Sequence, residues 1–186
     1  MGMPAPQTEW TAEKVRAFPD DGNRYEVLDG ELFVSPAPGY GHQFVAGELF
    51  TVLRAYVRTH RLGWVLLAPS DIEFSPQRLV QPDLFVVTDT GKGRPQAWSN
   101  DRQLSLVVEV LSASTARADR IRKRRIYQSE GVQEYWIVDA DSRLVERWRT
   151  GDDRPEIITD ILKWQPSADA EAAEIDLTAL FAAALD

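Results

Sequence analysis

The run Leu104-Ser-Leu-Val-Val-Glu-Val-Leu111 is the most strand-like part of the chain. Its apolar residues occupy both alternating positions of an extended chain, so neither side of the strand would face water. That pattern is typical of a central strand that is covered on both faces of a sheet. Ser114 or Thr115 can cap a helix that follows to about Ser129, and Gly131 ends that helix. The sequence therefore predicts a buried strand that leads directly into a helix.

Further strands and helices are predicted on both sides of this stretch. On the N-terminal side they are a helix over 8–18 capped by Thr8, a hairpin over 25–34, a helix over 42–60, and strands over 64–67, 72–74 and 83–87. On the C-terminal side they are strands over 135–138 and 144–148 and a final short helix. This order indicates an α/β (α+β) fold with a mixed central β-sheet flanked by helices. We expect a single domain over 1–186, with 150–186 as a C-terminal extension.

Composition limits the classes of function to consider. The 186 residues include no cysteine, which excludes disulfides, thiolate zinc sites and cysteine nucleophiles. The formal net charge of −8 argues against a protein that coats DNA through many basic contacts. No apolar run approaches the roughly 20 residues of a membrane helix, and the N-terminal segment lacks the pattern of a secretion signal. We therefore expect a cytoplasmic protein without a membrane partner.

Two acidic residues stand out because neighbouring strands can carry them to the same place. Glu109 lies inside the buried stretch, where a carboxylate must be paired, protonated or bound to a metal. Asp83 opens another predicted strand, directly after Pro82. Two carboxylates a few ångströms apart resist joint ionisation unless a cation intervenes, and oxygen ligands suit Mg²⁺ or Mn²⁺. The alternatives are a Glu109 that faces outward or pairs with an arginine, and an Asp83 that caps a turn.

Lys123 lies on the helix that follows the buried stretch. Helical spacing places Asp119, Lys123, Ile126 and Tyr127 on one side of this helix, so the lysine can point into the protein. An inward ammonium group could stabilise negative charge that develops on a phosphate. The alternative is a surface ion pair with Asp119, four residues earlier.

Other polar residues are candidates with less specific signals. Arg120, Arg122 and Arg124 lie on the same predicted helix and could contact the phosphates of a nucleic acid, although a run of charges is usually a solvated face. His42 begins a helix after a loop rich in glycine and proline, where it could bind a phosphate, orient a metal-bound water or cap the helix. Glu48 lies further along that helix and could supply another oxygen ligand.

Several of these residues fall within motifs that occur in a characteristic order. The motifs are Tyr25-Glu-Val-Leu-Asp-Gly-Glu31, His42, Gln81-Pro-Asp83, Val107-Val-Glu-Val-Leu-Ser112, Asp119 with Lys123 and Tyr127, and Gly131-Val-Gln-Glu-Tyr-Trp-Ile-Val-Asp139. The ordered set resembles the Uma2 restriction-endonuclease family, which belongs to the PD-(D/E)XK nuclease superfamily. The resemblance covers about 24–149 and adds Glu31, at the end of the first motif, as a further acidic candidate.

The resemblance implies a restriction-endonuclease-like core and assigns roles to particular residues. Asp83 matches the aspartate of the PD motif and Glu109 the acidic residue of the second motif, and both would bind Mg²⁺ together with the backbone carbonyl of Val110. The superfamily usually has lysine two residues after the second acid, where this chain has Leu111. The family would supply the lysine from the next helix instead, and Lys123 occupies that place.

The function that the resemblance implies is a metal-dependent endonuclease that hydrolyses phosphodiester bonds, with DNA as the expected substrate. A homodimer is also plausible on this ground. Two alternatives stay open. One is a non-catalytic module that binds nucleic acid or protein and retains the nuclease fold. The other is an internal salt-bridge cluster, in which arginines neutralise the two acids and no metal binds.

Overall fold

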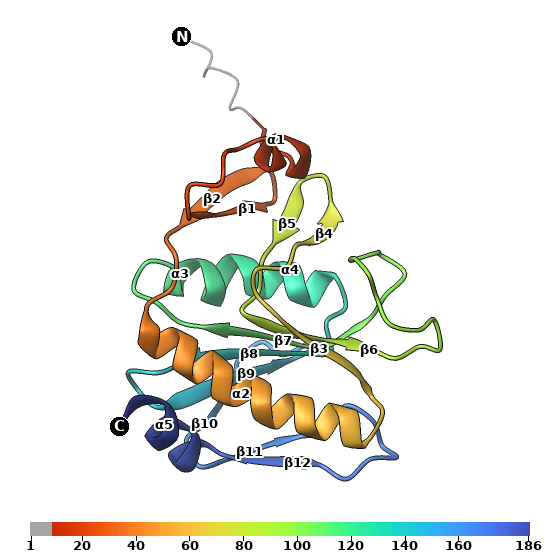
Figure 1. Cartoon of the computed structure of the whole chain (residues 1–186), viewed down its shortest axis with the longest axis vertical. Helices are drawn as coiled ribbons and strands as arrows, with labels where there is room; N and C mark the ends of the chain where they lie inside the picture. Colours follow the sequence, from red (N-terminus) through yellow and green to blue (C-terminus); the bar gives the residue numbers. More distant parts are fainter. Residues whose placement is uncertain (1–8) are drawn as a thin grey trace.

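The computed structural model describes residues 9–186 and contains a six-stranded sheet with the order β10-β9-β8-β7-β6-β3 (Figure 1). Its strands are β3 (Gly63–Leu67), β6 (Leu84–Thr88), β7 (Leu104–Val110), β8 (Glu134–Asp139), β9 (Leu144–Arg149) and β10 (Glu156–Ile158). β7 and β8 pair in parallel, whereas the other neighbours are antiparallel. A parallel pair needs a crossover connection, which consists of α3 (Ala116–Ala118), η1 (Asp119–Lys123) and α4 (Arg124–Ser129). The predicted α/β (α+β) class with a mixed central sheet is confirmed.

β7 lies inside the sheet and is buried along its whole length, which confirms a strand covered on both faces. Val108 and Val110 join one hydrophobic cluster, whereas Val107 joins a second cluster on the other face. Because side chains alternate along a strand, Glu109 points to the same face as Val107. The crossover helices cover that face, so the fold itself directs the Glu109 carboxylate toward them.

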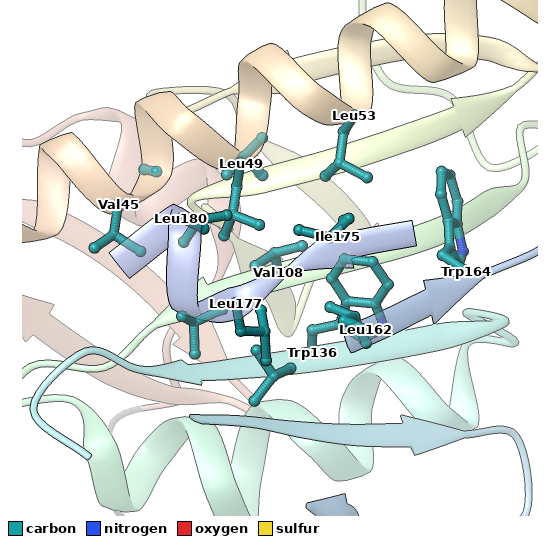
Figure 2. Packing of buried hydrophobic residues seen from close by; sticks show 14 of the residues in the cluster. Val45, Leu49, Leu53, Val108, Trp136, Leu162, Trp164, Ile175, Leu177 and Leu180 are labelled. Carbon is teal, nitrogen blue, oxygen red and sulfur yellow. The ribbon is translucent and has the colours of Figure 1, made fainter. Parts of the chain in front are cut away.

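The face that carries Val108 is covered by α2 (Tyr40–Thr59), α5 (Leu177–Leu185), β11 (Ile161–Trp164) and β12 (Ala173–Asp176). Figure 2 shows Leu49 and Leu53 of α2 projecting toward side chains of the C-terminal segment, such as Leu180 and Trp164. Each buried side chain of this size contributes about 1.5–3 kcal/mol relative to an exposed one. The residues expected to form an extension therefore complete the main core. Their strands β10, β11 and β12 were not predicted, because each has only three or four residues and the sequence after 149 is weakly patterned.

The opposite face carries the crossover helices and, beyond them, a four-stranded sheet with the order β2-β1-β5-β4 (Figure 1). Its strands are β1 (Arg24–Leu28), β2 (Glu31–Ser35), β4 (Ile72–Ser75) and β5 (Arg78–Val80). The predicted hairpin is confirmed: Asp29 and Gly30 have φ values of 52° and 81°, as a tight two-residue turn requires. This small sheet covers the crossover helices on the side away from β7, which encloses the space between them.

The N-terminal helix is shorter than predicted. α1 spans Ala12–Arg16, and the hydroxyl of Thr11 accepts a hydrogen bond from the Lys14 amide at 3.3 Å. Thr8, the predicted N-cap, lies outside the described residues. Within residues 9–186, no helix combines the length and the apolar composition that crossing a bilayer requires.

Gly63 controls how β3 enters the central sheet. Its φ is +145°, and a Cβ at this position would overlap the carbonyl oxygen of Val87. We expect Gly63→Ala to lower the free energy of unfolding by at least about 2 kcal/mol, since only glycine adopts this conformation readily. Gly47→Ala is the control: it lies on α2 with no atom within 4 Å of a new Cβ, so it should stabilise the helix by about 0.5–1 kcal/mol. Equal thermal unfolding midpoints for the two variants would contradict this.

Candidate active site

The structure brings Asp83 and Glu109 together at a cavity of about 230 Å³. Asp83 directly precedes β6, Glu109 lies on β7, and the two strands are paired neighbours. Glu26, His42 and Lys123 line the same cavity. We call this cavity the acidic pocket.

Asp83 is held from three directions and is only 3% exposed. Its Oδ1 accepts a hydrogen bond from the Arg24 guanidinium at 2.6 Å. Its Oδ2 accepts a hydrogen bond from the Val110 amide at 2.9 Å and lies 2.8 Å from Nε2 of His42. These contacts fix the carboxylate against the end of β7, beside Glu109.

Glu109 is buried, and both of its hydrogen bonds reach the same oxygen. Oε1 accepts one bond from Lys123 Nζ at 3.0 Å and one from the Tyr127 hydroxyl at 2.9 Å. Among residues 9–186, no donor bonds to its Oε2. Glu109 therefore keeps one oxygen that a ligand in the acidic pocket could engage.

Lys123 lies at the centre of a cluster of carboxylates. Its Nζ is 2.9 Å from Glu26 Oε2, 3.0 Å from Glu109 Oε1 and 3.4 Å from Asp119 Oδ1. The expected surface pair with Asp119 exists, but both residues are buried. They begin and end the π-helical turn η1, a feature that is often found at functional sites. Lys123 thus faces the protein interior rather than solvent.

Four residues at this site were not identified as site residues from the sequence: Glu26, Arg24, Asp119 and Tyr127. Glu26 is 1% exposed and accepts a hydrogen bond from the Gln81 amide. The signal that singled out Glu109, a carboxylate within an apolar strand, is also present in Tyr25-Glu-Val-Leu28. Applied to that shorter strand, the same reasoning would have identified Glu26.

The buried carboxylates resist ionisation. Burial raises the pKa of Glu109 well above its usual range, and repulsion from nearby carboxylates adds to this effect, while the Lys123 ammonium opposes it. Burial also raises the pKa of Glu26 and of Asp119, again against the attraction of Lys123. Added positive charge in the acidic pocket would therefore be stabilising.

The pKa values of Asp83 and Lys123 shift toward their charged forms, because attraction to opposite charges outweighs the effect of burial at both groups. Burial alone would raise the pKa of Asp83, but its contacts with His42 and Arg24 lower it below the usual value. Burial alone would lower the pKa of Lys123, but Glu109 and the other carboxylates hold it well above its ordinary range. This shift favours the charged form of Lys123, which suits a hydrogen-bond donor to negative charge.

The model of the family described as "Putative restriction endonuclease", Uma2, matches residues 12–179. The chain belongs to the Uma2 family. This match extends further in both directions than the motifs at 24–149. No curated protein matches the chain.

A solved structure resembles this Uma2 chain along nearly its whole length. It is a "putative nuclease belonging to DUF820" from Anabaena variabilis ATCC 29413. The TM-score is 0.74 with 17% sequence identity, and the likeness covers 94% of this chain and 99% of that one. At this level of identity the likeness establishes a shared fold.

The charges around the acidic pocket of this Uma2 chain do not balance. Glu26, Asp83 and Glu109 line the pocket, and Asp119 contacts Lys123 beside it. With all four ionised, they would carry four negative charges against the two positive charges of Arg24 and Lys123, an excess of two (4 − 2), which matches the raised pKa of Glu26, Glu109 and Asp119. A divalent cation would cancel this excess, and carboxylate oxygens are ligands that Mg²⁺ accepts. The donor set and the charge therefore fit such an ion.

The carboxylates are not arranged as a ready coordination shell. Within residues 9–186, no group of three or more histidine, aspartate or glutamate side chains is placed to hold a metal. Arg24 and His42 instead engage Asp83. In the described part of the chain, one guanidinium contacts Asp83 and none contacts Glu109, so the salt-bridge alternative applies to Asp83 but leaves Glu109 Oε2 open.

The remaining candidates lie in different surroundings. His42 lines the acidic pocket, whereas Glu31 and Glu48 do not. Glu31 is exposed and pairs with Arg122 at 2.6 Å. The pocket therefore draws its additional acid from Glu26, on β1, and not from Glu31, on β2.

The three arginines expected to contact nucleic acid all have partners within the protein. Arg120 pairs with Glu146 at 2.6 Å. Arg122 pairs with Glu31, and Arg124 donates to Gln128 and lies over the ring of Trp148. Each would have to exchange a protein contact for a phosphate.

Proposed function

We propose that this Uma2 chain is a metal-dependent endonuclease that hydrolyses the phosphodiester bonds of DNA. The observation that carries the proposal is the convergence of Asp83, Glu109 and Lys123 on one cavity. A protein that only binds nucleic acid has no need of two buried carboxylates and a buried ammonium group at one place. Membership of the family described as "Putative restriction endonuclease" supports the same reaction class.

Asp83 and Glu109 would hold Mg²⁺ or Mn²⁺, and the backbone carbonyl of Val110 is the expected third ligand. Asp83 would have to release Arg24 or His42, whereas Glu109 already has a free oxygen. When bound, a divalent ion lowers the pKa of a water molecule and neutralises charge on the scissile phosphate.

The protein's own groups have separate tasks in this proposal. Lys123 supplies a fixed positive charge beside the reacting phosphate. Tyr127 donates to Glu109 Oε1 and so would leave Oε2 available to a ligand. Glu26 and Asp119 keep the ammonium group of Lys123 charged and in place. These contacts require no movement at the moment of reaction.

Two exposed aromatic side chains at the N-terminal end of α2 are compatible with a nucleic-acid substrate. Tyr40 and Phe44 lie on the first turns of α2, on either side of His42 in the sequence, and are 85% and 61% exposed. Exposed rings of this kind provide surfaces on which bases can stack.

A non-catalytic binding module is the second candidate function. The ion pair between Arg24 and Asp83 favours it, since this contact satisfies an acid that a metal would need. The expected homodimer is compatible with either function and stays a prediction.

Incubation with supercoiled plasmid and with labelled oligonucleotides, in Mg²⁺ or in EDTA, tests the proposed activity. We expect cleavage only with the metal, and a loss of about 10²–10³-fold in Asp83→Asn. Asp101→Asn is the matched control, because Asp101 is an exposed loop residue paired with Lys92. No cleavage by the unaltered chain over a range of metals and substrates would favour the binding module.

A further inference from the structure

A second cavity lies at the other end of α2 and has the opposite charge. It measures about 490 Å³, within the ~300–1,000 Å³ range of ligand pockets. Arg54, Arg58, Arg61 and Arg94 line it, and Asp89 is the only acidic residue among its lining residues. We call it the arginine cavity. Its lining carries a net charge of +3 (4 − 1), in a chain whose net charge is −8.

The four arginines of this cavity form no ion pair within residues 9–186, although Arg54 lies over the ring of Phe50, 5.9 Å from its centroid. Within residues 9–186, none of them lies within 4.0 Å of a carboxylate. In this they differ from Arg120 and Arg122, which are paired. Four like charges with one counter-charge, Asp89, in the same lining repel one another, and an anion between them would relieve the repulsion.

The position of Arg61 adds to the argument. It follows α2 with a φ of +54°, a conformation in which glycine is usual after a helix. An arginine here is less stable than a glycine would be, yet its side chain lines the arginine cavity. The chain thus places a guanidinium group at a position where backbone preference favours a residue without a side chain.

The chemistry of the lining specifies the kind of anion. Trp64, at the start of β3, is half-buried and forms part of the wall. Guanidinium groups bind phosphate oxygens in pairs, and an indole ring stacks with a base. A basic groove with an aromatic side chain is typical of proteins that bind single-stranded nucleic acid.

We propose that the arginine cavity binds the phosphates of a single-stranded DNA segment, with one base against Trp64. Sixteen residues of α2 separate His42 from Arg58, which at ~1.5 Å per residue is about 24 Å. The arginine cavity is therefore a separate binding region from the acidic pocket. The inference rests on the proposed nuclease function for the identity of the ligand, but its test does not require cleavage.

The test measures binding of a fluorescent 20-nucleotide single strand by anisotropy in EDTA, over a range of salt concentrations. Arg54→Gln/Arg58→Gln should weaken binding about tenfold at low salt. It should also reduce the slope of log K against log salt by about 1.4, or ~0.7 for each phosphate that the variant no longer neutralises. Both side chains are exposed on a helix, so folding should be unaffected, as circular dichroism can verify.

Arg154→Gln is the matched control, since Arg154 is exposed and lies near β10, at the sheet edge opposite to β3. Equal affinities for the unaltered chain and the double variant would overturn the proposal, as would equal weakening in Arg154→Gln.

Plasmid cleavage in Mg²⁺ is measured in parallel, so that the arginine cavity and the nuclease function are tested separately. If the unaltered chain cleaves plasmid but the double variant binds the single strand normally, the proposed role of the arginine cavity is wrong and the nuclease function stands. If the double variant binds more weakly but the unaltered chain does not cleave, the result supports DNA binding at the arginine cavity and contradicts the nuclease function.

Discussion

The variant Glu109→Gln should lose Mg²⁺-dependent cleavage by about 10²–10³-fold and still be at least as stable as the unaltered chain without metal at pH 8. Its amide keeps the shape of the carboxylate and can accept the bond from Tyr127. It also removes a charge whose ionisation is opposed by burial and by neighbouring carboxylates. Activity and metal-free stability should therefore change in opposite directions, as expected where a functional charge is held at a cost to the fold.

The effect on stability should depend on pH in a defined direction. The pKa of Glu109 is raised in the folded state, so its contribution to stability is fully present below the unfolded pKa and is lost as pH rises through the folded value. Thermal unfolding in EDTA should show little difference between the variant and the unaltered chain at pH 5, and a higher midpoint for the variant at pH 8.

At pH 8, added metal should reverse the order of the unfolding midpoints of Glu109→Gln and the unaltered chain. Mg²⁺ or Mn²⁺ should raise the midpoint of the unaltered chain more than that of Glu109→Gln, since an ion that binds only the folded state stabilises it. Glu174→Gln is the control, because Glu174 lies on an exposed position of β12 and pairs with Lys163. If Glu109→Gln had a lower unfolding midpoint in EDTA than the unaltered chain at both pH 5 and pH 8, the ionised Glu109 carboxylate would not be destabilising, and this interpretation would be wrong.

Lys123→Met should cause the largest loss of stability, about 3–5 kcal/mol at pH 8. The substitution leaves Glu26, Glu109 and Asp119 buried without the cation that they share. At about 2–4 °C per kcal/mol, the unfolding midpoint should fall by roughly 6–20 °C. The loss should be smaller at pH 5, where these acids can take up protons.

Lys163→Met provides the comparison for that substitution. Lys163 also pairs with a glutamate, Glu174, but both side chains are more than 60% exposed. Exposed pairs contribute at most about 1 kcal/mol, so the midpoint should hardly move. If Lys123→Met were as mild as Lys163→Met, the buried cluster around Lys123 would not exist in solution.

Much of the fold could be predicted because its central element has few alternatives. The run 104–111 is apolar on both sides and rich in β-branched valine, which favours a strand inside a sheet, and a single carboxylate in it requires a partner. The same reasoning connects Asp83 and Lys123 with Glu109. Asp83 opens a predicted strand that can lie beside β7, and Lys123 lies on the helix that directly follows β7. The short strands β5, β10, β11 and β12 have too few residues for a period to emerge.

The rest of the site depends on contacts between residues that are distant in sequence. Arg24 reaches Asp83 across 59 positions, and Arg120 meets Glu146 across 26. No local pattern indicates which arginine pairs with which acid. The helix period correctly placed Asp119 beside Lys123, but it gave no sign that the small sheet would bury both.

A crystal structure of the chain soaked in Mn²⁺, with anomalous data collected to locate the ion, would show whether Asp83 and Glu109 share a metal. We predict a peak within coordination distance of both carboxylates, with Arg24 or His42 moved off the aspartate. Crystals without a peak there, in which Arg24 and His42 still hold Asp83 as they do without the ion, would contradict a metal-dependent site.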